Sequence, residues 1–327
     1  MSGPLFAALP PGSLFGIVAP AGPVAAERVA RVEALYAANG YRARIFGGCH
    51  AQSGHGLPYL AGDDEARVAD LHAALVDDEV AALHCLRGGY GAMRLLGGID
   101  VARVRAHPKL LIGYSDITAL HALWCQQGLP SLHAPMPASD LLLPGREADH
   151  DALFDLLRGG LVAATVLAPT LQAASNALHV PGVAEGLLIG GNLSLVAALL
   201  GTPWAWPTAG AILFLEDLNE EDYRVDRLLT QLRLAGVFDQ VAGVVLGSFT
   251  EMADPSGLLQ ERIASICQRA GKPLLAGWPT GHGTPNRPLP MGLRVRLVVE
   301  AHPAGRIELI EGLLASASPA ARKEPSP

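Results

Sequence analysis

The first half of the chain alternates short apolar segments with segments whose apolar residues recur at helical spacing. "SLFGIVAPAG" (13–22) is an apolar run that ends in a Gly/Pro turn, and "AAERVARVEALYAANG" (25–40) follows as a helix that stops at Gly40. The alternation continues through "YRARIF", "DDEARVADLHAALVDDEV", "AALHCLRGGYG" and "KLLIGYS". Such a pattern predicts a parallel sheet covered by helices on both faces, with functional residues at the carboxyl ends of its strands.

The pattern changes in the second half. The stretch 162–183 is rich in Ala, Thr and Pro and has weak periodicity, so we interpret it as a strand or two and a linker. The closing "LRVRLVVEAHPAGRIELIEG" alternates with period two around "HPAGR", which predicts a hairpin. We therefore predict an α/β domain over 1–165, a linker over 166–183, a smaller α+β domain over 184–315 and a disordered tail over 316–327.

Charge and cysteine usage exclude several classes of partner. The formal net charge is −7 and no run of Lys or Arg interrupts it, so a general nucleic-acid or anionic-membrane binder is not expected. No apolar stretch reaches about 18 residues, and the N-terminus lacks the charged region of a signal peptide.

The four cysteines show no CxxC spacing, which favours buried thiols in a reducing compartment. We expect a cytoplasmic protein.

Nucleotide and metal signatures are also missing. No G-x-G-x-x-G follows the first strand, no GKS or GKT occurs, and no His, Cys or Asp cluster has metal-ligand spacing. The expected cofactor set is therefore empty, for organic cofactors and for metals.

Ser115 stands at an unusual corner. In "LLIGYSDITALHALW" (110–124) an apolar strand runs into a helix with no spacer, which presents the corner side chain above the sheet edge. The free N–H groups of the helix start, that of Asp116 among them, could hold an oxyanion there. The other interpretation of Ser115 is a helix N-cap. Ser194 lies inside an apolar helix and Ser248 is not followed by a helix, so Ser115 is the better candidate nucleophile.

A nucleophilic serine needs a base, and eleven histidines are available. His121 lies six residues along the same helix on another face, and His84 lies in a strand pattern typical of a core residue. His133 follows a strand in "SLHAPMP" and stays a candidate. We favour His282, because "GWPTGHGTPNRP" is a loop whose composition can hold one side chain beside a cleft.

The base needs an acid that orients it. Glu216 ends the apolar strand "AILFL", where a carboxylate is costly unless it is hydrogen-bonded or functional, although a solvated strand end is the alternative. Asp217 should point to the opposite face. Two glycine clusters, "RGGYG" (87–91) and "IGGNLS" (189–194), could supply backbone N–H groups or receive a carboxylate.

Taken in order, the motifs "APAGP", "RGGYGAMRLL", "LIGYSDITALH", "HAPM", "GLLIGGNLSLVAALLGTPW", "LFLEDLNEEDYRVDRLLTQLRLAG" and "GHGTPNRPLPMG" resemble the LD-carboxypeptidase family of serine peptidases. The resemblance covers about residues 12–313, with "HAPM" where the family pattern leads us to expect "HGPM". It implies a flavodoxin-like N-terminal domain, a swivelling-type C-terminal domain and a homodimer.

The resemblance also implies site residues. The catalytic residues fall on Ser115 as nucleophile, Glu216 as acid and His282 as base, and the oxyanion hole on the backbone N–H groups of Asp116 and Gly89. The two glycine clusters supply the predicted substrate-binding residues Tyr90, Gly191 and Asn192.

The implied substrate is a cytoplasmic muropeptide, cleaved between an L-centre and a terminal D-residue through an acyl-enzyme. Two alternatives stay open. One is an amide hydrolase of the same family that cleaves a peptidyl-nucleotide such as microcin C, with Trp204 and Trp206 stacking the base or merely packing. The other is a ligand-binding protein without catalysis, which the joint presence of Ser115, Glu216 and His282 disfavours.

Overall fold

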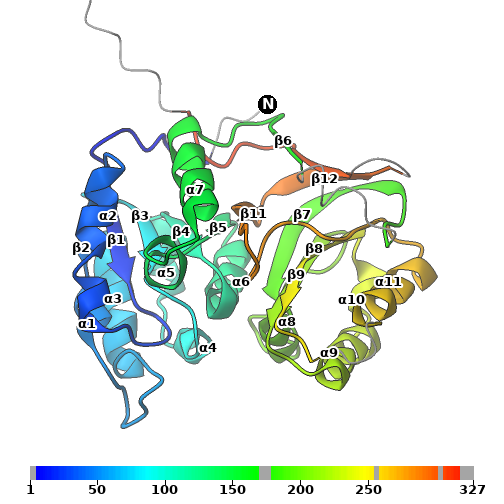
Figure 1. Ribbon diagram of the computed structural model, residues 1–327, viewed down its shortest axis with the longest axis horizontal. Coiled ribbons are helices and arrows are strands. Elements are labelled where there is room, and N and C mark those ends of the chain that lie inside the picture. The colour runs from blue at the N-terminus through cyan, green and yellow to red at the C-terminus, as the bar shows by residue number, and fades with distance from the viewer. Residues whose placement is uncertain (1–4, 169–177, 254–257, 301–304, 317–327) are drawn as a thin grey trace, which may run out of the picture.

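A computed structural model describes residues 5–168, 178–253, 258–300 and 305–316. It contains two β-sheets with helices around them (Figure 1). The first sheet and its helices occupy the left of the view in Figure 1, and the second sheet with its helices occupies the right. The predicted α/β architecture with two distinct parts is confirmed. The exact domain boundaries stay predictions, and residues 317–327 of the predicted tail lie outside the described residues.

The first sheet has the strand order β11-β5-β4-β3-β1-β2. Strands β2, β1, β3, β4 and β5 are mutually parallel, and their order is that of flavodoxin-like folds. The strands are β1 (Leu14–Val18), β2 (Arg42–Ile45), β3 (Val80–Cys85), β4 (Leu110–Gly113), β5 (Ser131–His133) and β11 (Leu289–Met291). The helices of this part are α1 (Ala26–Val29), α2 (Val32–Ala38), α3 (Asp64–Val76), α4 (Ala92–Leu95), α5 (Val101–Ala106), α6 (Thr118–Gln126) and α7 (Glu147–Gly159), with shorter turns at Gly47–His50, Ser115–Ile117 and Pro137–Leu141.

Both faces of the first sheet are covered, as the near-continuous apolar strands predict. In β1, Leu14 and Val18 pack in one core cluster, and Phe15 and Ile17 pack in another. This split follows from the two-residue period of a strand. Side chains of α3, α4 and α6 join the first cluster, and side chains of α1, α2 and α7 join the second. The carboxyl ends of the parallel strands stay free to build a site.

The second sheet has the strand order β10-β9-β8-β7-β12-β13-β6 and is mixed. Strands β7 to β10 are parallel, and β12, β13 and β6 join them as antiparallel neighbours. The strands are β6 (Val166–Leu167), β7 (Gly182–Asn192), β8 (Ile212–Leu218), β9 (Gly243–Thr250), β10 (Leu274–Leu275), β12 (Arg294–Val299) and β13 (Arg306–Leu309), and the helices are α8 (Leu193–Ala198), α9 (Asp222–Leu234), α10 (Val237–Gln240) and α11 (Leu259–Arg269). The predicted closing hairpin corresponds to β12 and β13.

Two strands depart from a strict separation of the chain into consecutive parts. Strand β11 comes from the second half of the sequence but pairs antiparallel with β5. The prediction of a purely parallel first sheet is therefore wrong at this edge. Strand β6 lies within 162–183, which we interpreted as a strand or two and a linker, and it pairs with β13 of the second sheet. These strands are two and three residues long, and segments this short carry no periodicity from which a sheet partner can be assigned.

The two parts also meet through side chains and backbone. Helix α6 packs against β7 and α8, and the Thr118 hydroxyl accepts a hydrogen bond of 3.0 Å from the Asn192 amide N–H. Gly191 has φ +134°, and a Cβ there would lie 2.5 Å from the Thr118 Oγ1. Only glycine allows this approach. The carboxyl end of β7 is thereby held beside the start of α6.

Two smaller expectations can be compared with this fold. Cys49, Cys85 and Cys125 are free buried thiols, as predicted. Trp206 is buried in the core cluster that also contains Leu14 and Val18 of β1, and Trp204 packs against the same cluster. Packing is therefore the role that the structure gives these tryptophans.

Candidate active site

The serine corner forms as the sequence predicts. Strand β4 ends at Gly113, a short 3₁₀ turn spans Ser115–Ile117, and α6 begins at Thr118. Ser115 has φ +64°, a left-handed conformation that non-glycine residues rarely adopt. This strained corner lifts the side chain of Ser115 away from the strand and helix backbones. An N-cap interpretation has no support, since no side-chain hydrogen bond caps this turn or α6.

A glycine of the 87–91 loop lies directly against the serine. A Cβ on Gly88 would come within 2.8 Å of the Ser115 Cβ and 3.0 Å of its Oγ. The Gly88 carbonyl accepts a hydrogen bond of 3.1 Å from the Gly22 N–H, which fixes the loop beside the first strand. Sequence reasoning named Gly89 in this motif and missed Gly88. The sequence shows the glycine pair but not which member meets the serine, because that approach depends on the tertiary structure.

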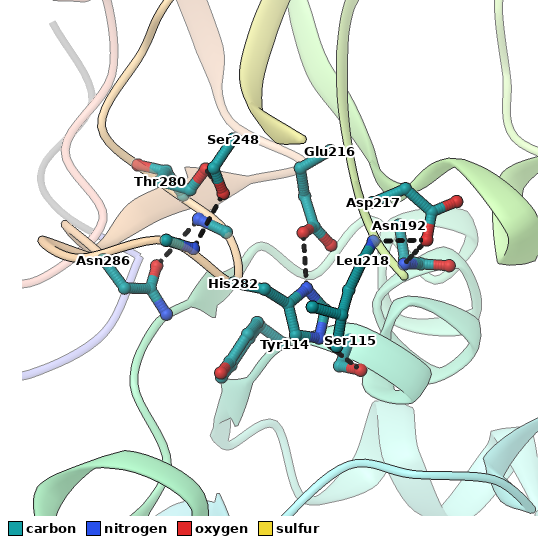
Figure 2. Close-up of polar contacts among 12 residues, drawn as sticks. Tyr114, Ser115, Asn192, Glu216, Asp217, Leu218, Ser248, Thr280, His282 and Asn286 are labelled. Atoms are coloured by element: carbon teal, nitrogen blue, oxygen red, sulfur yellow. Dashed lines mark hydrogen bonds and ion pairs between the residues drawn. The ribbon is translucent and has the colours of Figure 1, made fainter. Parts of the chain in front are cut away.

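The structure brings Ser115, His282 and Glu216 together in one chain of hydrogen bonds (Figure 2). The Ser115 Oγ lies 3.0 Å from the His282 Nε2, and the His282 Nδ1 lies 2.7 Å from the Glu216 Oε2. Glu216 is fully buried at the end of β8. A buried carboxylate hydrogen-bonded to Nδ1 selects the tautomer whose Nε2 can accept a proton from the serine. This arrangement is able to perform nucleophilic acyl transfer.

The pKa of His282 results from two opposed effects. Burial by itself lowers the pKa of the imidazole, because it disfavours the charged form. The negative charge and the hydrogen bond of Glu216 raise it, and the net pKa lies above the ordinary value of 6.5. Glu216 therefore supports an imidazolium, which forms when a base takes the proton of a nucleophile.

The loop that carries His282 is held on the second sheet by Ser248. The Ser248 Oγ donates to the Thr280 carbonyl at 3.3 Å and accepts from the Gly283 N–H at 2.9 Å. Gly281 has φ +120°, and a Cβ there would lie 2.7 Å from the Glu216 Oε2. Ser248, which sequence reasoning considered as a second nucleophile, is thus a structural partner of the histidine loop.

The same loop is also anchored to the first part of the chain. The Asp149 Oδ1 accepts a hydrogen bond of 2.6 Å from the Asn286 N–H, and the Arg146 guanidinium donates to the Gly283 carbonyl at 3.0 Å. Arg146 and Asp149 form an ion pair of 2.9 Å. Sequence reasoning missed both residues, because their role depends on a contact between segments 137 positions apart.

Tyr114 supports the imidazole of His282 from the side. The two rings have their centroids 4.9 Å apart at an interplanar angle of 57°. The Tyr114 hydroxyl donates to the Asp140 Oδ1 at 2.8 Å, which fixes the ring. Burial above all, with a further contribution from Asp140, raises the pKa of Tyr114 well above its ordinary value, so the phenol stays protonated.

The other histidines have different roles. Both ring nitrogens of His133 are buried without a hydrogen-bond partner among the described residues, and its ring packs against Tyr114 and Phe214. His84 is a buried residue that hydrogen-bonds the Tyr36 hydroxyl and the Pro135 carbonyl. His121 lies 2.9 Å from the Gly113 carbonyl through Nε2. Of the candidate bases, His282 is therefore the one in contact with Ser115.

Asp217 lines the same cavity as His282 but has other hydrogen-bond partners, and the pairing of β8 with β9 is irregular between Leu215 and Asp217. Its two carboxylate oxygens accept four hydrogen bonds of 2.8–3.0 Å, from the Asn192 Nδ2, the Ser194 N–H and Oγ, and the Leu218 N–H. The two neighbouring acids therefore have separate partners. Glu216 contacts the imidazole, and Asp217 ties β8 to the start of α8.

Asp116 is buried and its carboxylate accepts a hydrogen bond of 2.7 Å from the Ala92 N–H. Burial raises the pKa of Asp116 to about 6. Its own backbone N–H lies in the first turn after the corner, where amides have no intrahelical partner. This amide is available to an oxyanion on the substrate.

A cavity of about 480 Å³ opens over Ser115 and His282. Three further predicted residues line it, namely Asp116, Gly89 and Asn192. Gly191 and Tyr90 do not belong to its lining: Gly191 packs on Thr118, and Tyr90 lines a smaller neighbouring cavity of about 270 Å³. The remaining lining residues are Arg87, Gly88, Tyr114, Met136, Ser139, Arg146, Ser194, Leu195, Asp217, Leu218, Glu220 and Glu251.

No group of three or more His, Cys, Asp or Glu side chains in the described ranges is arranged to hold a metal ion. Among the helices of the same ranges, none combines the length and the apolar character needed to cross a bilayer.

Comparison with known families gives two matches along the chain. The LD-carboxypeptidase N-terminal domain matches residues 15–134, and the LD-carboxypeptidase C-terminal domain matches residues 185–297. The first match includes Ser115, and the second includes Glu216 and His282.

Individual relatives agree with the family. A probable murein peptide carboxypeptidase of Bacillus subtilis is 36% identical over 299 residues, which cover 89% of this chain and 90% of that protein. The murein tetrapeptide carboxypeptidase of Pseudomonas aeruginosa is 36% identical over 242 residues, 72% of this chain and 78% of that protein.

Solved structures share the fold. The muramoyltetrapeptide carboxypeptidase of Oxalobacter formigenes has a TM-score of 0.80 at 28% identity and covers 90% of this chain and 98% of its own. The MccF structure in complex with glutamyl sulfamoyl guanosine has a TM-score of 0.81 at 21% identity, covers 95% of this chain and 100% of its own, and shows the fold alone. On the two family matches and these relatives, the chain belongs to the LD-carboxypeptidase family and is a peptidase.

Proposed function

We propose that this protein is a serine carboxypeptidase that removes a C-terminal D-amino acid from muropeptides through an acyl-enzyme. The observation that carries the proposal is the continuous chain from the Ser115 Oγ to the His282 Nε2 at 3.0 Å and from the His282 Nδ1 to the Glu216 Oε2 at 2.7 Å. The muropeptide substrate is supported by the relatives named murein carboxypeptidases.

In the first step, the Nε2 of His282 takes the proton of the Ser115 hydroxyl as Oγ attacks the carbonyl that precedes the terminal residue. A tetrahedral oxyanion forms, and the backbone N–H groups of Asp116 and Gly89 are assigned to it, since both residues line the cavity beside Ser115. Glu216 holds the imidazole and stabilises its charged form.

In the second step, the imidazolium gives its proton to the leaving amine, and the C–N bond breaks to leave the peptide esterified on Ser115. Water, deprotonated by His282, then hydrolyses the ester and restores the serine. The free terminal amino acid and the shortened peptide are the two products. Each role uses a side chain or amide at the junction of the two sheets.

The two alternatives fare differently. Cleavage of a peptidyl-nucleotide is suggested by a 26% match over 266 residues to the microcin C7 self-immunity protein of Escherichia coli, but Trp204 and Trp206 pack in or against the core and are poorly placed to stack a base. A binding protein without catalysis would not need a buried carboxylate behind a histidine that contacts a strained serine.

The decisive experiment incubates the purified chain with a muropeptide ending in D-Ala, and separately with a peptidyl-adenylate, and reads the products by mass spectrometry. The proposal expects release of D-Ala from the first substrate, and no release by the Ser115→Ala variant. Cleavage of the adenylate with no action on the muropeptide would replace the proposed substrate class. We further propose that the protein is a cytoplasmic homodimer: light scattering of the purified protein tests the dimer, and cell fractionation tests the location.

A further inference from the structure

The cavity over Ser115 contains two arginines that differ in their charge balance. Arg146 is paired with Asp149 at 2.9 Å, so its charge is already compensated. Arg87 is half-buried, and its printed partners are carbonyl oxygens: Nε donates to Gly88 at 3.2 Å and Nη1 to Pro23 at 3.1 Å. Within the described residues, no carboxylate lies at ion-pair distance from the Arg87 guanidinium.

The groups that shift the pKa of Arg87 include no carboxylate. Burial, and then the positive charge of Arg28, lower the pKa of the guanidinium. A partly buried cation without a counterion is costly, and an anionic ligand removes that cost. Since Arg87 lines the same cavity as Ser115, the ligand that binds there is the natural source of the anion.

The Arg87 guanidinium and the Ser115 hydroxyl lie beside two consecutive glycines of the same loop. A Cβ on Gly88 would lie 3.0 Å from the Ser115 Oγ, and a Cβ on Gly89 would lie 3.6 Å from the Arg87 Nη2. In a carboxypeptidase substrate, the terminal carboxylate is one residue beyond the carbonyl that is attacked. A substrate whose carbonyl is at Ser115 therefore has its carboxylate in the part of the cavity that Arg87 also lines.

We infer that Arg87 binds the C-terminal carboxylate of the substrate and thereby restricts cleavage to the last peptide bond. This inference rests on the proposed function and adds its recognition element. A guanidinium suits this task because its planar fork can bind both oxygens of a carboxylate. Arg87 acts as a specificity residue, and the chemistry stays with Ser115, His282 and Glu216.

The test compares two tetrapeptides that differ only at the C-terminus, one ending in D-Ala with a free carboxylate and one ending in D-Ala carboxamide. The kcat/KM of each is measured for the wild-type chain, Arg87→Gln, Arg87→Lys and the control Arg94→Gln. Arg94 is an arginine outside the cavity over Ser115 that pairs with Asp64.

The kcat/KM of the wild type is expected to be about 10²-fold higher for the acid than for the amide. Removing one partner of a buried charge pair has an effect of this size. Arg87→Gln should lose this preference, because its kcat/KM for the acid should fall while its kcat/KM for the amide stays nearly unchanged. Arg87→Lys should keep part of the preference, and Arg94→Gln should keep all of it.

A purely structural role for Arg87, bridging Gly88 and Pro23, would slow both substrates equally. Arg87→Gln with the wild-type preference therefore overturns the inference while the proposed function stands. A wild-type chain that cleaves neither peptide overturns the proposed function, and the inference falls with it. Should Arg87→Gln not fold, the ratio measured for Arg87→Lys decides: a reduced preference supports the inference, and an unchanged preference overturns it.

Discussion

The hydroxyl oxygen of Ser115 lies 3.0 Å from the Nε2 of His282, although the two residues are 167 positions apart in the chain. Ser115 stands at the end of a strand of the first sheet, and His282 lies in a loop held on the second sheet by Ser248. Their contact therefore depends on how the two parts are docked. Arg146 and Asp149 contribute to that docking, because they bind the histidine loop from the N-cap and the first turn of α7.

Replacing Ser115 by alanine should abolish hydrolysis while the fold is kept. The change removes one hydroxyl from a partly exposed corner, and the expected fall in kcat/KM is about 10³-fold or more. Steady-state kinetics measure the rate, and circular dichroism checks the fold. A variant that keeps more than a tenth of the wild-type rate would assign the nucleophile to another residue.

Glu216→Gln should lower kcat by at least about 10²-fold with little change in KM, because the amide can stabilise the wrong imidazole tautomer and carries no charge. Asp217→Asn is the matched control. Asp217→Asn should change kcat much less and should instead lower the melting temperature. The NH₂ group of the new amide would face N–H and O–H donors whose hydrogen bonds the Asp217 carboxylate accepts. A larger loss of kcat in Asp217→Asn than in Glu216→Gln would contradict the assignment.

The pH dependence of kcat/KM should follow His282. As a base it must be neutral, so activity falls as the pH drops through its pKa, which lies above 6.5. Burial lowers this pKa and Glu216 raises it, so the residual activity of Glu216→Gln should have its acid limb at lower pH than the wild type. Rate profiles of both proteins test this. An unmoved or upward-shifted limb would show that another group titrates.

Gly88→Ala should strongly impair catalysis. The added Cβ would lie 2.8 Å from the Ser115 Cβ, so the serine or the loop must move. A displacement near 1 Å at a reacting group costs about 10²-fold in rate. Gly97→Ala is the control, because a Cβ there meets no atom within 4 Å. Equal activities of the two variants would place Gly88 outside the machinery.

Chelation should leave the rate unchanged. The proposed mechanism takes its nucleophile from Ser115 and its base from His282, and neither step calls on a metal-bound water. Activity is measured after dialysis against EDTA, with dialysis against buffer as the control. Loss of activity that zinc restores would contradict the serine mechanism.

Much of the local structure could be predicted from the sequence. The apolar runs and helical periodicities of 13–134 predict a parallel sheet with helices on both faces. The strand-to-helix corner at Ser115 follows from the lack of a spacer after β4. The different hydrogen-bond partners of Glu216 and Asp217 agree with the expectation that adjacent strand residues differ in direction. These features depend on neighbours in the chain, so the local pattern carries them.

The tertiary structure alone decided which distant groups meet. The pairing of β11 with β5, the anchoring of Gly283 by Arg146, and the contact of Gly88 with Ser115 join segments whose own patterns contain no information on their partners. Motif resemblance indicated that Ser115, Glu216 and His282 act together, but not the distances among them. Those distances result from packing α6 against β7 and α8, where shape and burial of whole surfaces determine the fit.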